Sequence, residues 1–218
     1  MDGENLKKFL KIAALTLIAL AIALIAPVKA QITNVAILPA TITIPSVGAE
    51  ESADLNITDV TNLYAYEIMI WFDKFVVNAT NVTRPAGHFM EPQIDPGNQF
   101  VLAWQINNNF NATHGRIYLG FTLLNPEVAR NGSGILARIF FKGLTINSTT
   151  IVLNDYPGEL GPVKLGGREG LEVTKIAHTA TGGSINVVPE FPVGLLLTFL
   201  AATAVTVSFA KLRKRKPL

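Results

Sequence analysis

The sequence predicts an all-β fold, and three observations support that prediction. Apolar residues recur at every second position in several short segments, as they do in strands that bury one face. Clusters of Asn, Gly, Pro and Ser separate these segments and mark turns. No segment between the two apolar ends of the chain has a convincing helical period. About nine short strands with turns between them are typical of a β-sandwich or a barrel.

Prolines interrupt the first predicted strand. Residues 35–44 alternate apolar with polar side chains, but the segment contains Pro39 and is followed by Pro45. Because proline has no backbone donor for a sheet ladder, we expect this segment at a sheet edge or as two short pieces. A second alternating strand is predicted at residues 53–60.

The most strongly patterned strand covers residues 63–72, between Asn62 and Asp73. Both of its sides are apolar apart from one Glu, so we expect it to lie between other layers of the structure. One side is expected to face the core, and the other to face whatever covers the outside of the sheet. The core side holds Tyr66, Ile68, Ile70 and Phe72, and the outer side holds Ala65, Glu67, Met69 and Trp71.

The rest of the domain is predicted from shorter signals. A brief strand at residues 75–77 precedes a long irregular loop at residues 78–98, which is rich in Pro and Gly. Three later strands each have one inward apolar face, and short strands follow at residues 149–153, around 171–173 and at 184–188. The three inward faces are Phe100, Leu102, Trp104 and Ile106; Ile117, Leu119, Phe121 and Leu123; and Ile135, Ala137, Ile139 and Phe141.

Two apolar ends flank this domain. Residues 1–30 have the basic start, the apolar run and the small final residues of a secretory signal peptide, with cleavage expected between Ala30 and Gln31. An uncleaved N-terminal anchor is the alternative. Residues 191–210 form an uncharged apolar run that would span about 30 Å as a helix, and the basic tail 211–218 is expected in the cytoplasm. The β domain, residues 31–188, is therefore expected outside the cell membrane.

The charge and the cysteine content exclude several classes of function. The 218-residue chain has a net charge of +2, but residues 31–190 hold fourteen acidic and nine basic residues, a net charge of −5. A mildly acidic domain is poorly suited to binding nucleic acid through phosphate contacts. The chain has no cysteine, which excludes thiol catalysis, cysteine-bound metals and attachment of a lipid through cysteine.

Six Asn-x-Ser/Thr triplets indicate N-glycosylation. Chance would produce about two such triplets in the exported part, given its content of Asn, Ser and Thr. Ordinary polar turn chemistry is the alternative. We predict glycans on several of these asparagines, the first on the outward side of its strand and the others in or near turns: Asn56, Asn78, Asn81, Asn111, Asn131 and Asn147.

The sequence contains no convincing catalytic or metal-binding motif. His88, His114 and His178 do not have the spacing of metal ligands. Residues 161–168 have the glycine spacing of a phosphate loop but lack its Lys-Ser/Thr ending, so we interpret them as a turn. Residues 54–58 begin like a calcium loop but lack its central Gly and closing Glu. We therefore expect neither an enzyme nor a bound metal or cofactor.

Aromatic side chains are the remaining candidates for recognition, because a planar ring can stack on a sugar. One of them, Trp71, fits the core better than an exposed face. The candidates are Tyr64, Trp71, Phe89 and Tyr156.

Several motifs resemble the cohesin-type domains of exported archaeal proteins. The resemblance starts at Val47-Gly48 and continues through residues 55–64. The strand that follows ends, as in the family, on an aromatic residue and an Asp, here Phe72-Asp73. Residues 132–141 are similar to the family's Gly-x-Gly-x-Leu-Ala-x-Ile-x-Phe strand. Residues 148–153 and 176–187 resemble its last strands, although Lys74 and Gly182 differ from the family's usual turn residues.

This resemblance implies a jelly-roll β-sandwich of about nine strands that acts by binding. Cohesins hold dockerin modules of partner proteins, and relatives with the same fold bind polysaccharide. No partner contact can be carried over to a particular residue. The segment Pro189-Glu190-Phe191-Pro192, with the apolar run and the basic tail, also resembles an archaeal sorting signal. That likeness implies removal of the segment by an archaeosortase-like enzyme and attachment to a lipid, while a plain transmembrane anchor fits the same layout.

Three functions follow as hypotheses. The leading one is a glycosylated, membrane-anchored surface module that recognises a dockerin-like protein or a polysaccharide. The second is a subunit of a surface coat or filament, in which a segment such as residues 35–44 completes a neighbour's sheet. The weakest is an exported glycoside hydrolase, for which Asp155 with Glu159, or Glu50 with Glu51, could form the carboxylate pair.

Overall fold

The computed structural model describes residues 32–153, 163–169, 172–190 and Thr203. The first 31 residues lie outside the described residues. The signal peptide and its cleavage site, the apolar span and the loop that contains Asp155, Tyr156 and Glu159 therefore stay predictions. Within the described residues, no helix is long and apolar enough to cross a membrane.

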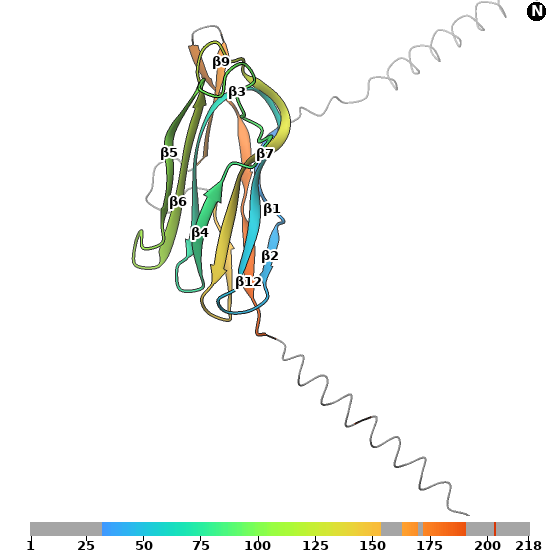
Figure 1. Ribbon diagram of the computed structural model, residues 1–218, viewed down its shortest axis with the longest axis vertical. Helices are drawn as coiled ribbons and strands as arrows, with labels where there is room; N and C mark the ends of the chain where they lie inside the picture. Colours follow the sequence, from blue (N-terminus) through green and yellow to red (C-terminus); the bar gives the residue numbers. More distant parts are fainter. Residues whose placement is uncertain (1–31, 154–162, 170–171, 191–202, 204–218) are drawn as a thin grey trace, which may run out of the picture. The chain divides into compact units, whose positions relative to one another are not determined.

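The prediction of an all-β sandwich is confirmed (Figure 1). The described part of the chain contains twelve strands, against the nine or so that were predicted. The strands are β1 (Thr33–Leu38), β2 (Thr41–Ile44), β3 (Glu50–Asp73), β4 (Val77–Thr83), β5 (Gln99–Asn107), β6 (His114–Leu123), β7 (Arg130–Gly143), β8 (Ser148–Ile151), β9 (Val163–Glu169), β10 (Glu172–Lys175), β11 (His178–Thr181) and β12 (Gly183–Val187).

Strand β3 runs for 24 residues and belongs to both layers of the sandwich. Its first half pairs with β1 and β7, and its second half pairs with β6 and β9. The separate strands predicted at residues 53–60 and 63–72 are therefore one strand. The predicted break was wrong because the residues between the two halves bend the strand without ending it.

Two residues with a left-handed backbone conformation make this bend. Asp59 has a φ of 57° and Asn62 a φ of 65°, and the register between β3 and β7 shifts on both sides of Val60. Asp and Asn adopt this conformation more readily than most residues with a side chain, and bulges of this kind increase the local twist. The Asp59 N–H donates to Ser133 Oγ at 2.9 Å, and the Asn62 N–H donates to Asn131 Oδ1 at 2.7 Å. These bonds hold the bend against the start of β7.

The bend divides the strands into two layers. One layer has the order β4-β7-β3-β1-β11, and the other has the order β5-β6-β3-β9-β10. A small sheet with the order β2-β12-β8 completes the sandwich. Residues 35–44 are divided between β1 and β2, which lie in different sheets. The prediction of two short pieces on either side of Pro39 is thus confirmed.

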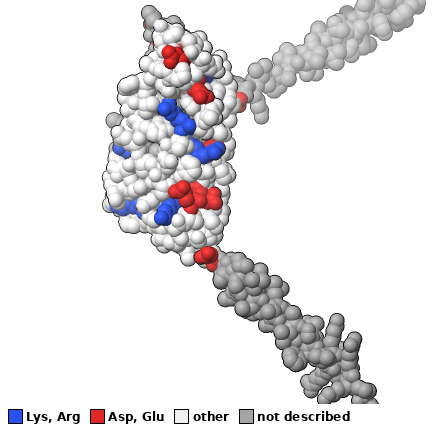
Figure 2. Space-filling model, in the orientation of Figure 1, with Lys and Arg blue, Asp and Glu red and all other residues white. Residues whose placement is uncertain are grey.

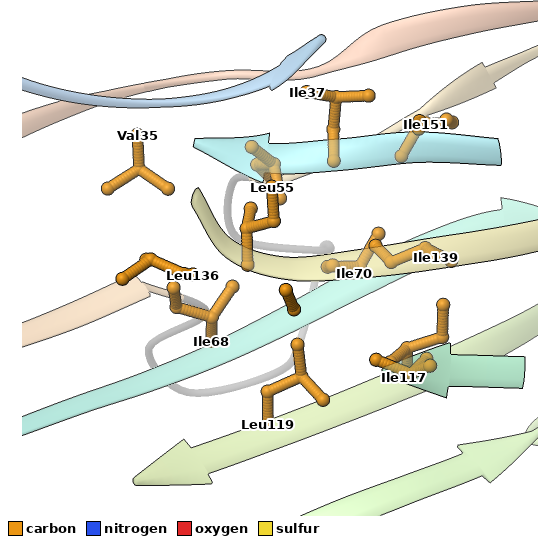
Figure 3. Packing of buried hydrophobic residues seen from close by; sticks show 14 of the residues in the cluster. Val35, Ile37, Leu55, Ile68, Ile70, Ile117, Leu119, Leu136, Ile139 and Ile151 are labelled. Atoms are coloured by element: carbon orange, nitrogen blue, oxygen red, sulfur yellow. The ribbon is translucent and has the colours of Figure 1, made fainter. Parts of the chain in front are cut away.

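Apolar side chains from both layers form one core. Phe72 of β3 meets Phe141 of β7 edge to face, with 5.6 Å between the ring centroids. The predicted core side of β3 is confirmed, since its four side chains are all buried. In Figure 3, Val35, Ile37, Leu55 and Ile139 of one layer lie across from Ile68, Ile70, Ile117 and Leu119 of the other.

Two other predicted segments were wrong. Residues 75–77 are mostly a turn, and β4 occupies the start of the predicted loop at residues 78–98. Of residues 161–168, interpreted as a turn, residues 163–168 belong to strand β9. Gly167 explains the error, because a Cβ there would lie only 3.1 Å from the Asn62 carbonyl oxygen. The absence of a side chain at Gly167 permits close packing of the strands, and this glycine does not mark a turn.

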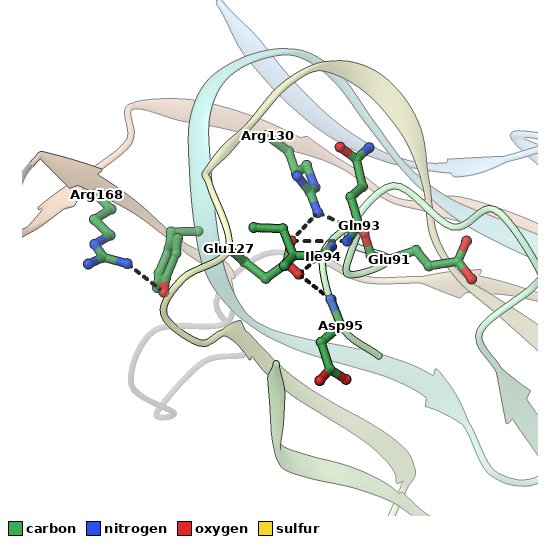
Figure 4. Close-up of polar contacts among 8 residues, drawn as sticks. Glu91, Gln93, Ile94, Asp95, Glu127, Arg130 and Arg168 are labelled. Carbon is green, nitrogen blue, oxygen red and sulfur yellow. Dashed lines mark hydrogen bonds and ion pairs between the residues drawn. The ribbon is translucent and has the colours of Figure 1, made fainter. Parts of the chain in front are cut away.

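A buried carboxylate holds the loop between β4 and β5 (Figure 4). The Glu127 carboxylate accepts backbone hydrogen bonds from Gln93 at 3.0 Å, Ile94 at 2.7 Å and Asp95 at 3.1 Å. Arg130 lies 3.0 Å from it, and the Glu127 side chain is fully buried. Burial alone raises a carboxyl pKa, but these four hydrogen bonds together lower the pKa of Glu127 to about 2.

Candidate functional site

The outer surface of the β5-β6-β3-β9-β10 layer holds a pocket of about 710 Å³. Its middle lies over β3 and β6, where the outward residues Ala65 and Thr122 pair with each other. Phe100 and Leu102 of β5 line one side, and Lys164 of β9 lines the other. The pocket exists because the side chains on the outer face of β3 and β6 are short there, whereas those on the neighbouring strands β5 and β9 are longer.

A bulge in β5 turns two apolar side chains into this pocket. The register with β6 shifts between Val101 and Ala103, so Leu102 is the extra residue of the bulge. Trp104 then lies opposite Leu119, on the inward side. Phe100, before the bulge, is on the outward side and 53% exposed, and Leu102 is 60% exposed.

The predicted inward face of this strand was therefore half wrong. Trp104 and Ile106 pack against the core as expected, whereas Phe100 and Leu102 lie on the surface. One inserted residue reverses the alternation of a strand. If odd-numbered residues face inward before the insertion, even-numbered residues face inward after it. The missing side chain of Gly120 makes room for the bulge, since a Cβ there would lie 3.1 Å from Leu102 Cβ.

A polar row borders the apolar part of the pocket. Glu67 Oε2 lies 3.1 Å from Lys164 Nζ, and Tyr118 donates its hydroxyl hydrogen to Glu67 Oε1 at 2.9 Å. Burial and the hydrogen bond to Glu67 raise the pKa of Tyr118. Because the Lys164–Glu67 pair is solvent-exposed, it contributes little to stability and instead fixes the position of its side chains.

Trp71 does not belong to an exposed binding face. It is 0% exposed, and its ring meets Phe110 edge to face at 5.0 Å. The guanidinium of Arg116 lies 4.0 Å from the centre of the Phe110 ring and 5.8 Å from that of Trp71. Trp71 also exchanges two backbone hydrogen bonds with Val152. The proposal of Trp71 as a sugar-stacking residue is wrong, because other side chains already cover both sides of this part of β3.

The other aromatic candidates do not gather at one site either. Tyr64 is largely buried, and its hydroxyl accepts a hydrogen bond from Arg168 Nη1 at 2.7 Å, a contact drawn in Figure 4. Phe89 packs over Gly134 and is partly buried against the core. Tyr156 lies outside the described residues. Of the four, none lines the pocket among the residues described.

No predicted glycosylation asparagine lines the pocket. Three of them are on the opposite layer, Asn56 in β3 and Asn78 and Asn81 in β4. The last two were expected in a turn but lie in a strand. Asn131 was also expected in a turn but is the second residue of β7. Asn111 and Asn147 lie in loops, as expected.

The accessibility of these asparagines differs. Asn81, Asn131 and Asn147 are exposed. Asn56 is half-buried on a strand between β1 and β7, and its Oδ1 is fully buried without a hydrogen-bond partner among the described residues. Asn56 therefore offers less room for a glycan than the sequence suggested.

Among the described residues, the polar and charged candidates do not gather into a metal site. In the part of the chain that is described, no three His, Asp or Glu side chains lie close enough to hold a metal ion. His88 is buried against Phe121 at 6.0 Å between ring centroids, and burial lowers its pKa. Glu50 and Glu51, the candidate carboxylate pair among the described residues, lie on the surface at the start of β3. In Figure 2, charges of both signs are scattered over the visible face without a large patch of either.

Sequence reasoning missed the pocket residues Phe100, Leu102, Glu67 and Lys164. A signal for the first two was present in residues 100–104, which are five consecutive apolar residues. A strand with five in a row does not alternate strictly, and this pattern indicates either two buried faces or a bulge. The contact between Lys164 and Glu67 could not be predicted from the local sequence, because the two residues are 97 positions apart.

No family model matches the sequence, and no curated protein has a similar sequence. Solved structures do match the fold. The seventh type I cohesin of ScaB from Pseudobacteroides cellulosolvens gives a TM-score of 0.54 at 18% identity, over 73% of this chain and 94% of that one. The chain has the cohesin fold.

Two further cohesins support this assignment. A type II cohesin domain from the cellulosome of Acetivibrio cellulolyticus gives a TM-score of 0.54 at 17% identity, over 72% of this chain and 96% of that one. The third cohesin of ScaC from Acetivibrio cellulolyticus, solved in complex with the ScaB dockerin, gives 0.51 at 17% identity, over 72% and 99%. At these identities the likeness of this chain to the solved cohesins concerns the fold alone.

Proposed function

We propose that this cohesin-type domain is an exported binding module that holds a dockerin-like module of a partner protein. The binding surface is the outer face of the β5-β6-β3-β9-β10 layer. The observation that carries the proposal is the pocket on that face, with Phe100 and Leu102 exposed beside it. Contiguous exposed apolar side chains on a soluble domain are typical of a protein interface.

The composition of the pocket fits a protein partner. Two large apolar side chains lie beside a row of polar groups, Glu67, Tyr118 and Lys164, which can form hydrogen bonds around an apolar contact. The class of partner comes from the fold neighbours, among them the Acetivibrio cellulolyticus cohesin that was solved with a dockerin.

A polysaccharide ligand has less support. Sugar rings are commonly held by exposed aromatic faces. Tyr64 and Trp71 are buried, and Phe100 is the one aromatic residue that lines the pocket among the described residues and is exposed.

The coat hypothesis has less support. Strand β1 lies between β3 and β11 in its own sheet. Donation of this strand to a neighbour would break both of these ladders.

Glycosylation and anchoring complete the proposal. Asn81 and Asn131 are exposed and lie away from the pocket, so glycans there leave the binding face open. The C-terminal apolar run attaches the domain to the outside of the cell membrane when it is kept whole. If the chain is cut near Pro189–Pro192, a lipid attached in its place holds the domain there.

A pull-down with two matched variants tests the binding face. Leu102→Glu places a charge on a pocket residue that is 60% exposed, and Val128→Glu places the same charge on a residue that is 62% exposed but does not line the pocket. We expect Leu102→Glu to weaken retention of a purified calcium-loop (dockerin) module at least about tenfold, since a buried unpaired charge is costly at an interface. Val128→Glu is expected to bind as the unmodified protein does.

The proposed face would be contradicted if both variants weakened binding of the module equally, or if neither weakened it. Retention of a glycan and not of the protein module would favour the polysaccharide hypothesis. An intact mass equal to that of the bare polypeptide would refute glycosylation alone.

A further inference from the structure

The end of the sandwich from which the chain leaves carries a group of exposed apolar side chains. We call this surface the exit end, and it consists of the loops at residues 45–49, 74–76 and 144–147. Each of the three loops contributes at least one exposed apolar residue. These residues are Val47, Phe75, Leu144 and Ile146.

Backbone hydrogen bonds join the three loops into one surface. Gly48 N–H donates to the Gly143 carbonyl at 2.8 Å, and Leu144 N–H donates to the Val76 carbonyl at 2.9 Å. The hydroxyl of Thr145 donates to the Phe75 carbonyl at 3.0 Å. The apolar side chains are therefore presented together on one supported surface.

The last described part of the chain starts from this surface. Val187 N–H donates to the Asn147 carbonyl at 2.9 Å, and Val188 N–H donates to the Ile44 carbonyl at 3.0 Å. Two residues separate Val188 from Phe191, where the apolar run of residues 191–210 begins. Three extended residues reach no farther than about 11 Å. A bilayer crossed by this run must then lie close against the exit end.

We infer that the exit end rests on the lipid surface, with Phe75 and Ile146 in the headgroup layer. The inference rests on the proposed anchoring of the C-terminal run and adds which surface of the domain meets the membrane. The headgroup region adds about 5–8 Å on each side of the hydrocarbon core, a depth that exposed loop side chains can enter.

The residues of the exit end suit this environment. Phe75 is 59% exposed and Ile146 is 56% exposed, so burial in the interface removes apolar area from water. Lys74 Nζ lies 5.4 Å from the centre of the Phe75 ring, and Lys with an aromatic ring is a common pair at membrane interfaces. Asn147 directly follows Ile146, so a glycan there would hold the loop off the membrane. We therefore expect Asn147 to carry none.

The absence of cysteine from the chain makes a clean test possible. The full chain is placed in phosphatidylcholine vesicles that contain lipid with a nitroxide near the headgroup, after a fluorophore is attached to single cysteines. Phe75→Cys and Ile146→Cys report on the exit end. Val128→Cys is the control, because it is 62% exposed and lies in the loop after β6, at the opposite end of the sandwich. We expect quenching at the two exit-end positions to be at least about three times that at the control.

Flotation of the same full-length variants with the vesicles separates the possible failures. Chains that float and show equal quenching at all three positions would overturn the lipid contact and leave the anchoring intact. Chains that do not float would overturn the anchoring and this inference together. Glycopeptide mapping adds an independent check, since a glycan found on Asn147 would also contradict the lipid contact.

Discussion

Glu127 illustrates how much a single buried side chain can organise. Its carboxylate receives three backbone N–H groups of the loop between β4 and β5 and pairs with Arg130. A carboxylate buried without such partners would become neutral. Here the partners keep it charged, and its low pKa measures how strongly they do so.

The low pKa of Glu127 makes stability depend on pH in a defined window. The folded-state pKa of about 2 lies below the ordinary value of 4.5, so the folded protein binds fewer protons than the unfolded chain between these values. The stabilisation is complete above about pH 4.5 and is lost as the pH falls toward 2. We expect Glu127→Gln to lower the urea midpoint at pH 7 and to flatten its decline between pH 4.5 and 2.

Glu91→Gln is the control for this measurement, because the Glu91 carboxylate accepts one exposed hydrogen bond from Gly87. We expect it to keep the pH dependence of the unmodified protein. Retention of the full pH dependence by Glu127→Gln would assign the effect to other carboxylates.

At the scale of the element, β3 determines the architecture. It crosses from one layer to the other through Asp59 and Asn62, and each half pairs with different neighbours. An ordinary extended backbone at these two positions would continue β3 within one layer. The bend therefore depends on residues that tolerate a positive φ.

Two substitutions of Asn62 isolate the cost of this backbone conformation. Both remove the hydrogen bond from Asn62 Nδ2 to the Arg168 carbonyl, but Gly adopts a φ of 65° freely and Ala does not. We expect Asn62→Ala to be less stable than Asn62→Gly by about 1 kcal/mol, measured by urea unfolding. Equal stability of the two variants would show that the bend is not strained at this position.

At the scale of the whole molecule, the core between the layers supplies the stability. The domain has no disulfide to assist it, because the chain lacks cysteine. Contacts such as that between Phe72 and Phe141 join the layers directly. The outer faces are thereby left free for a pocket on one layer and for exposed asparagines on the other.

Two phenylalanines three positions apart test this division. Phe72 is fully buried between the layers, whereas Phe75 is 59% exposed at the exit end. We expect Phe72→Ala to lower the free energy of unfolding by about 3–5 kcal/mol. Phe75→Ala is expected to change it by less than about 0.5 kcal/mol in the absence of membrane. Similar losses for both variants would place Phe75 in the core and remove it as a lipid contact.

The sequence by itself determined the fold class and most inward faces. The alternation of Tyr66, Ile68, Ile70 and Phe72 is local, and burial of one strand face follows from it without knowledge of the partner strands. The motifs around Asp59, Asn62 and Phe72 carried the resemblance to cohesins, and in this chain the first two residues form the bend of β3.

Only the tertiary structure decided where the pocket lies. The bulge at Leu102 depends on the pairing of β5 with β6, and the small residue beneath it, Gly120, belongs to β6. Trp71 was ambiguous in the sequence, because an apolar outer side can be covered or can be a binding face. Phe110 and Arg116, brought from a distant loop and strand, cover it. Alternation along a strand is a property of the local chain, whereas what lies over each face depends on contacts between residues far apart in the sequence.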